Sequence, residues 1–148
     1  MESQVQYGTV TLDIDNCVNG LWGAVADNEA KQLEVPALSR RIQEAKDELV
    51  LVQAQVVDAG FANGKFPAGK SNAEERGRAE VQLLAGDAAY QTALRKVRDL
   101  EFRYELAKTE AELATKRVGA WREVVWVKGA QLLNAAEVPA GGNGHGAF

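Results

Sequence analysis

The residues whose types and spacing are best suited to chemistry lie between Gly64 and Ser71, where the sequence reads GKFPAGKS. This spacing matches the Walker A motif of a P-loop, whose backbone amides hold phosphates while a lysine reaches the β- and γ-phosphates and a hydroxyl binds magnesium. Here these groups would be Lys70 and Ser71. An apolar run before the loop and a helix start after it also suit the motif. One alternative function is therefore that of a small P-loop nucleotide-binding protein.

The wider sequence argues against a P-loop. The motif needs a parallel sheet with crossover helices, and the chain offers no convincing set of further strands. A Walker B aspartate after an apolar strand is also missing, unless Asp13 or Asp15 serves. With one cysteine, Cys17, and one histidine, His145, most nucleophilic and metal chemistry is excluded as well. We therefore expect no enzymatic activity, no catalytic residues, no metal site and no cofactor.

The same loop has a second interpretation as a binding surface, because no acid lies between Asp58 and Glu74. Aromatic rings interleaved with bases can stack on a single-stranded nucleic acid and neutralise it, or bind an acidic protein. The alternative is that the rings cover the end of a hydrophobic core and the bases are merely solvated. The candidate binding residues are Phe61, Lys65, Phe66, Lys70 and Arg76.

The element that must position this loop is a long helix predicted from Ala88 to Ala136. Apolar residues recur there in steps of three and four, a pattern typical of a helix that packs on a partner helix. At ~1.5 Å per residue it would be roughly 70 Å long, too long to fold without partners. The residues predicted to mediate self-association are Tyr104, Ala107, Ala111, Ala114, Val118 and Trp121.

A second heptad stripe covers residues 35–57. It begins beside Pro36, which is expected to interrupt or begin a helix. An earlier stripe starts at Val18 and weakens through Asn28 and Lys31. Residues 5–14 are β-branched and predict a short strand or an ordered arm. A capping box of Ser71 with Glu74 predicts a helix over 72–84, and residues 85–87 read as a stop followed by a new N-cap.

These patterns predict an all-α protein, a long antiparallel helical hairpin or coiled coil completed by self-association. The expected organisation is an N-terminal arm at 1–15, a hairpin at 16–137 with its tip at 58–87, and a flexible glycine-rich tail at 138–148. Leu94, Leu106, Leu113 and Val124 would flank the seam and favour a dimer or a larger closed assembly.

The net charge of −4 does not suggest a dedicated duplex-DNA binder. No signal peptide and no run of ~18 apolar residues appears, so we expect no membrane association. The lone cysteine suits a reducing compartment, and a cytoplasmic location is expected.

Residues 69–113 resemble a class of small tailed-phage coiled-coil accessory proteins. The shared pattern is a glycine-lysine loop (Gly69-Lys70), a helix start like that of Asn72–Arg76, and the D-x-x-Y of Asp87–Tyr90 that opens a long helix. The resemblance covers about a third of the chain and assigns no catalytic residue. It implies an accessory factor in phage DNA recombination or replication, or an inhibitor of a host factor, acting in the host cytoplasm on a host or phage protein or on single-stranded nucleic acid. A virion or assembly scaffold protein is the other alternative.

Overall fold

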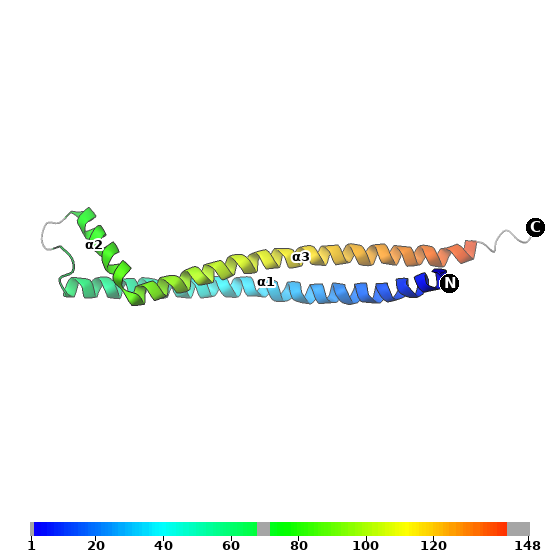
Figure 1. Cartoon of the computed structure of the whole chain (residues 1–148), viewed down its shortest axis with the longest axis horizontal. Helices are drawn as coiled ribbons and strands as arrows, with labels where there is room; N and C mark the ends of the chain where they lie inside the picture. The colour runs from blue at the N-terminus through cyan, green and yellow to red at the C-terminus, as the bar shows by residue number, and fades with distance from the viewer. Residues whose placement is uncertain (1, 68–71, 142–148) are drawn as a thin grey trace, which may run out of the picture. The chain divides into compact units, whose positions relative to one another are not determined.

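The computed structural model describes the backbone of residues 2–67 and 72–141, and the side chains of residues 14–67 and 72–136. Within those backbone ranges the chain forms three helices and no strand: α1 (Glu2–Ala62), α2 (Ala73–Gly86) and α3 (Ala88–Gly141) (Figure 1). The all-α prediction is confirmed. None of the described helices is long and apolar enough to cross a membrane.

The chain divides into two compact units, and each contains a part of α1 and a part of α3. The terminal unit combines Met1–Leu33 with Lys108–Phe148, and the tip unit is the continuous segment Glu34–Ala107, which includes α2. Because each unit has its own packed seam, each is described separately below.

In the terminal unit, α1 and α3 run antiparallel. Gly20 lies against the ring of Trp121, and eleven residues further along α1, Lys31 pairs with Glu110, eleven residues earlier on α3. Small side chains fill the seam between the helices. Its buried members are Cys17, Ala111, Ala114 and Val118, of which Ala114 is only 1% exposed. Small residues allow two helix backbones to approach closely.

In the tip unit the core is larger and more aliphatic. Leu38, Ala45, Val97, Leu100 and Ala107 form one buried cluster, with partly buried neighbours packed against it. Those neighbours are Val35, Ile42, Leu49 and Tyr104. On the rim of this cluster, Lys46 pairs with Glu101 and Lys96 with Glu48. Exposed ion pairs contribute little stability each, so the apolar cluster holds this unit together.

Two expectations for α1 were wrong. Residues 5–14 are helical rather than a strand, and Pro36 lies inside the helix rather than at a boundary. A lone strand would leave its backbone groups without partners, whereas a longer helix satisfies them internally. Pro36 removes one helical hydrogen bond, but Val35 and Leu38 beside it pack on the core of the tip unit and keep the helix in place.

The end of α3 also differs from the expected boundary. The helix continues to Gly141, past the predicted tail start at Val138. Good helix formers and alanines precede this point, and the helix runs through Pro139 before it ends at the glycines. Residues 142–148, with His145, lie outside the described residues.

Candidate functional site

The candidate site is the corner where α1 ends and α2 begins, and a Schellman motif forms the end of α1. Gly64 has a φ of +67°, a conformation that glycine adopts without strain. The amide of Lys65 donates to the carbonyl of Gly60 at 2.8 Å, and the amide of Gly64 donates to that of Phe61 at 3.2 Å. This turn reverses the chain and returns Phe66 to the side of α1.

Phe61 and Phe66 form a stacked pair at this turn. Their ring centroids are 4.0 Å apart and the planes differ by 13°. Phe66 is partly buried, while Phe61 remains 58% exposed. The sequence predicted either that both rings cover the end of a core or that both are exposed for binding. In the structure Phe66 covers the corner, whereas Phe61 presents an apolar face to solvent.

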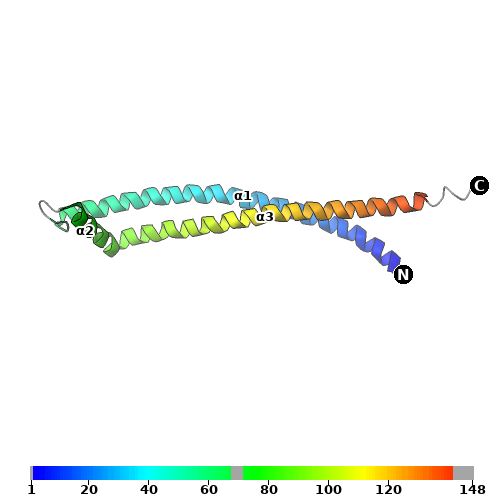
Figure 2. The ribbon, with the colours of Figure 1, turned by 90° about the horizontal axis from the view of Figure 1, so that it is seen from above.

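Gly60 allows α2 to pack against the end of α1. A Cβ atom at this position would lie 2.4 Å from Cδ2 of Leu83 and 2.9 Å from Cε2 of Phe66. Both distances are too short for any side chain to be accommodated without movement. The absence of a side chain at Gly60 thus lets Leu83 of α2 and Phe66 of the turn meet α1 at one point. Figure 2 shows the ribbon of α2 beside the end of α1 from above.

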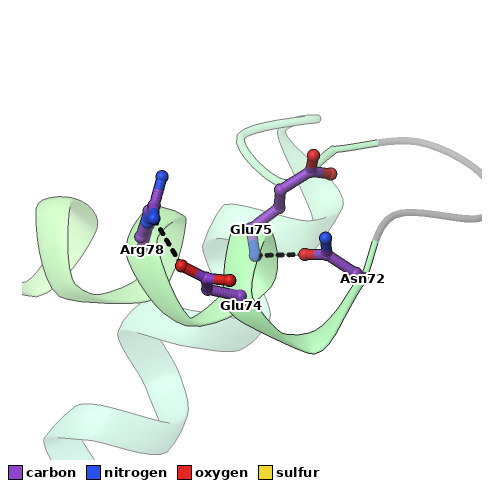
Figure 3. Close-up of polar contacts among 4 residues, drawn as sticks. All are labelled: Asn72, Glu74, Glu75 and Arg78. Atoms are coloured by element: carbon purple, nitrogen blue, oxygen red, sulfur yellow. Dashed lines mark hydrogen bonds and ion pairs between the residues drawn. The ribbon is translucent and has the colours of Figure 1, made fainter.

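The start of α2 is fixed by Asn72, whose side-chain oxygen accepts a hydrogen bond from the amide of Glu75 at 2.8 Å (Figure 3). One turn on, Arg78 pairs with Glu74. The cap therefore lies one residue after the predicted Ser71, which is outside the described residues, and Glu75 rather than Glu74 occupies the third helical position. Asparagine is as good a cap as serine because its oxygen also reaches the free amides of the first turn.

The junction of α2 and α3 confirms the predicted stop and new N-cap. Asp87 donates its amide to the carbonyl of Leu84 at 3.3 Å, which ends α2. Its carboxylate accepts a hydrogen bond from the amide of Tyr90 at 2.8 Å, which begins α3. One residue thus ends the first helix and caps the second, and a carboxylate is favourable at a helix N-terminus.

The fold also brings an acid to the predicted basic loop. Lys65 and Asp87 line the same two surface pockets, together with Leu83. Glu74 and Glu75 occupy the first turn of α2, where Arg76 is exposed. The segment is free of acid along the chain, but the corner in three dimensions is not.

Of the five predicted binding residues, the structure brings together Phe61, Lys65 and Phe66. Arg76 lies on the first turn of α2, and Lys70 is outside the described residues. Sequence reasoning missed Leu83 and Asp87, since their proximity to Lys65 depends on the angle at which α2 returns. The only local signal was the capping pattern at residue 87, which says nothing about a neighbour across the corner.

The Walker-like segment lacks the structural context of a P-loop. The residues before it form the C-terminal end of helix α1, where a P-loop needs a buried strand. Gly69, Lys70 and Ser71 lie outside the described residues. The apolar run at 49–57 is helical because its residues continue the heptad stripe of α1, with Leu49 packed on the core.

The six residues predicted for self-association lie on the stripe of α3 that packs on α1 of the same chain. Ala107, Ala111, Ala114 and Val118 are buried, and Tyr104 and Trp121 are partly buried. This stripe is the interhelical seam of the predicted hairpin. The apolar side chains left exposed on α3 lie on other faces, and they include Leu106, Leu113 and Val124.

The residues whose side chains the structure describes hold no group of three or more His, Cys, Asp or Glu that could bind a metal. The described residues of the corner offer an exposed ring at Phe61, and a lysine that lines the same pockets as Asp87 and Leu83. Comparison of the chain with models of protein families, with curated proteins and with solved structures found no match.

Proposed function

We propose that this protein is a non-enzymatic helical binding protein and that its partner, another protein, contacts the corner between α1 and α2. The observation that carries the proposal is the exposed ring of Phe61, which is stacked on Phe66, the residue that follows Lys65 in the turn. An aromatic ring held rigidly at a surface is a common anchor of protein interfaces. We take this partner to be a bacterial host or phage protein, because residues 69–113 resemble small tailed-phage accessory proteins.

A protein partner suits the corner better than a nucleic acid does. Beside Lys65, Arg76 and Arg78, the corner carries the acids Glu74 and Asp87. Arg78 is already paired with Glu74. A surface with this balance attracts a phosphate backbone weakly, because such binding depends on an excess of Lys and Arg. Burial of an aromatic ring against an apolar pocket needs no such excess.

Phe61→Ala is expected to weaken partner capture about tenfold or more, the loss typical of a central aromatic anchor. The tagged protein is incubated with a bacterial host lysate, and bound proteins are quantified by mass spectrometry. Phe102→Ala is the matched control, because Phe102 is a phenylalanine exposed on α3 of the same unit. A partner should be lost with Phe61→Ala and kept with Phe102→Ala.

A binding assay with labelled single-stranded DNA is run beside the capture experiment. The proposal fails if both variants retain the same captured proteins. It also fails if Phe61→Ala weakens DNA binding and no captured protein depends on that ring. Thermal melting of both variants checks that the fold is kept, which is expected because each ring is mostly exposed.

A second candidate function is assembly through self-association, and one row on α3 of the terminal unit favours it. Leu113, Ala120 and Val127 recur every seven residues, so they share a face of the helix, and Val124 lies one turn from Ala120. Leu113, Val124 and Val127 are exposed. A second chain packed on this row would bury them, and full burial of such a side chain contributes ~1.5–3 kcal/mol.

Light scattering at micromolar concentration is expected to give the mass of a dimer or larger assembly. Leu113→Glu with Val127→Glu should shift that mass toward the monomer, because a carboxylate in an apolar interface loses its solvation. Lys116→Glu, an exposed change on the same helix, should leave the mass unchanged. A monomer mass for the unsubstituted chain would rule out the assembly function.

A further inference from the structure

The seam of the terminal unit contains polar residues where its heptad pattern calls for apolar ones. Counting in steps of seven from Ile14 and Cys17, Asn28 and Lys31 fall at seam positions of α1. Both are only partly exposed. Each therefore gives up some hydration, and its partner on α3 must compensate.

Those partners are specific. The hydroxyl of Thr115 donates to the side-chain oxygen of Asn28 at 3.0 Å, and Nε2 of Gln32 donates to the same hydroxyl at 3.2 Å. Nζ of Lys31 contacts Oε2 of Glu110 at 2.5 Å. Two adjacent seam positions of α1 are thus matched to two polar residues of α3.

A steric match lies eleven residues from Lys31, at Gly20. A Cβ atom there would lie 2.7 Å from Cη2 of Trp121 and 2.8 Å from two further ring carbons. The indole therefore fits over a position that has no side chain. This match is independent of the polar contacts because it depends on shape.

The apolar part of the seam does not by itself distinguish one alignment from another. Its α3 residues Ala111, Ala114 and Val118 are small and similar, and seam positions recur every seven residues on both helices. If α1 slid by seven residues along α3, seam positions would still face seam positions, with comparable apolar contacts.

The specific contacts do distinguish the alignments. The residues seven before and after Glu110 are Arg103 and Arg117, so a slide in either direction sets a cation opposite Lys31. The residues seven before and after Gly20 are Asp13 and Asp27, so the same slide sets a charged side chain under the Trp121 ring. A slide in either direction is therefore disfavoured twice, by Arg103 or Arg117 opposite Lys31 and by Asp13 or Asp27 under the Trp121 ring.

We propose that these contacts form a register lock, in which Gly20–Trp121, Lys31–Glu110 and Asn28–Thr115 select one alignment of α1 on α3 in the terminal unit. The exposed Lys31–Glu110 pair is weak as a source of stability. The lock acts through the difference in free energy between alignments. The native alignment has paired charges and a fitted ring, whereas the slid alignments have like charges and a carboxylate under the ring. It does not depend on what the corner binds.

The lock can be moved by one heptad without changing the composition of the chain. The changes Gly20→Asp, Asp27→Gly, Glu110→Arg and Arg117→Glu transfer the glycine on α1 and the acid on α3 by seven residues each. Both transfers favour the same new alignment, in which position 27 faces Trp121 and position 117 faces Lys31. The moved lock should therefore pull α1 into the slid register.

Spin labels report the alignment. They are attached to exposed positions of the same unit through Glu29→Cys and Glu112→Cys, in a Cys17→Ala background, and labelled chains are diluted with unlabelled ones. Positions 29 and 112 are level with each other when Gly20 faces Trp121. The original lock should give one distance population, and the moved lock should add ~10 Å of separation along the helix axis, seven residues at ~1.5 Å each.

An unchanged distance in a moved-lock chain of full helix content would overturn the proposal. If the four substitutions lower the helix content measured by circular dichroism, Asp27→Gly with Glu110→Arg and Arg117→Glu is tested by zero-length carbodiimide cross-linking, because glycine at both 20 and 27 lets the Trp121 ring fit either alignment and leaves the charge pair to decide between them. A Lys31 cross-link to position 117 supports the lock, and its absence in that folded chain overturns it. The unsubstituted chain, cross-linked between Lys31 and Glu110, is the control.

Discussion

Leu38→Ala is expected to lower the free energy of unfolding by ~2–5 kcal/mol, the range for a large aliphatic side chain removed from a packed core. Leu38 is 5% exposed and belongs to the cluster with Ala45, Val97, Leu100 and Ala107. The cavity would lie within this cluster, where the surrounding side chains are already packed and can relax into it only in part. The measurement is the urea midpoint followed by circular dichroism.

Leu33→Ala is the matched control for this change. It is the same substitution on the same helix, five residues earlier, but Leu33 is 72% exposed. Its effect should stay within about 0.5 kcal/mol, as for most surface substitutions. If Leu38→Ala and Leu33→Ala lower the free energy of unfolding by the same amount, the cluster around Leu38 is not the core of the tip unit.

Gly20→Ala is expected to destabilise the terminal unit by ~1–3 kcal/mol, although alanine is the better helix former. The added methyl group would lie 2.7 Å from the Trp121 ring, and an indole is too rigid to yield by a small bend. Either the ring or the helix must move, and both lose contacts in the seam. The expected result is a lower melting temperature and a change in tryptophan fluorescence.

Gly23→Ala, three residues further on, should do the opposite. A Cβ atom there meets no atom within 4 Å, so only the intrinsic helix preference remains, about 0.5–1 kcal/mol in favour of alanine. If the two Gly→Ala substitutions change the free energy of unfolding in opposite directions, the effect at Gly20 comes from its packing against Trp121. A stabilising effect at both glycines would mean that the indole does not occupy the position over Gly20.

The sequence by itself determined the helical class and the helix boundaries on either side of α2. Heptad spacing is a local property, because residues three and four apart share a face whatever lies opposite. The stop and cap at residues 85–87 were also local, and the capping signal at residue 71 was wrong by only one position. Helix ends are readable in this way because side-chain caps act on amides within one turn.

The tertiary structure decided what the helices face. Local patterns predicted a strand at 5–14 and an interruption at Pro36, yet one helix runs through both. The heptad stripes predicted that two long helices of the chain face each other, but only the fold shows which residues of α1 meet those of α3, such as Gly20 against Trp121.

The candidate site depended on tertiary structure most of all. Phe61 and Phe66 look alike in the sequence, but the turn at Gly64 exposes one ring and covers the other. Lys65 lies in a stretch without acids, but the return of α2 over Gly60 brings Asp87 to its pockets. Burial and charge at a corner are set by residues distant in the chain, and spacing along one helix carries no information about them.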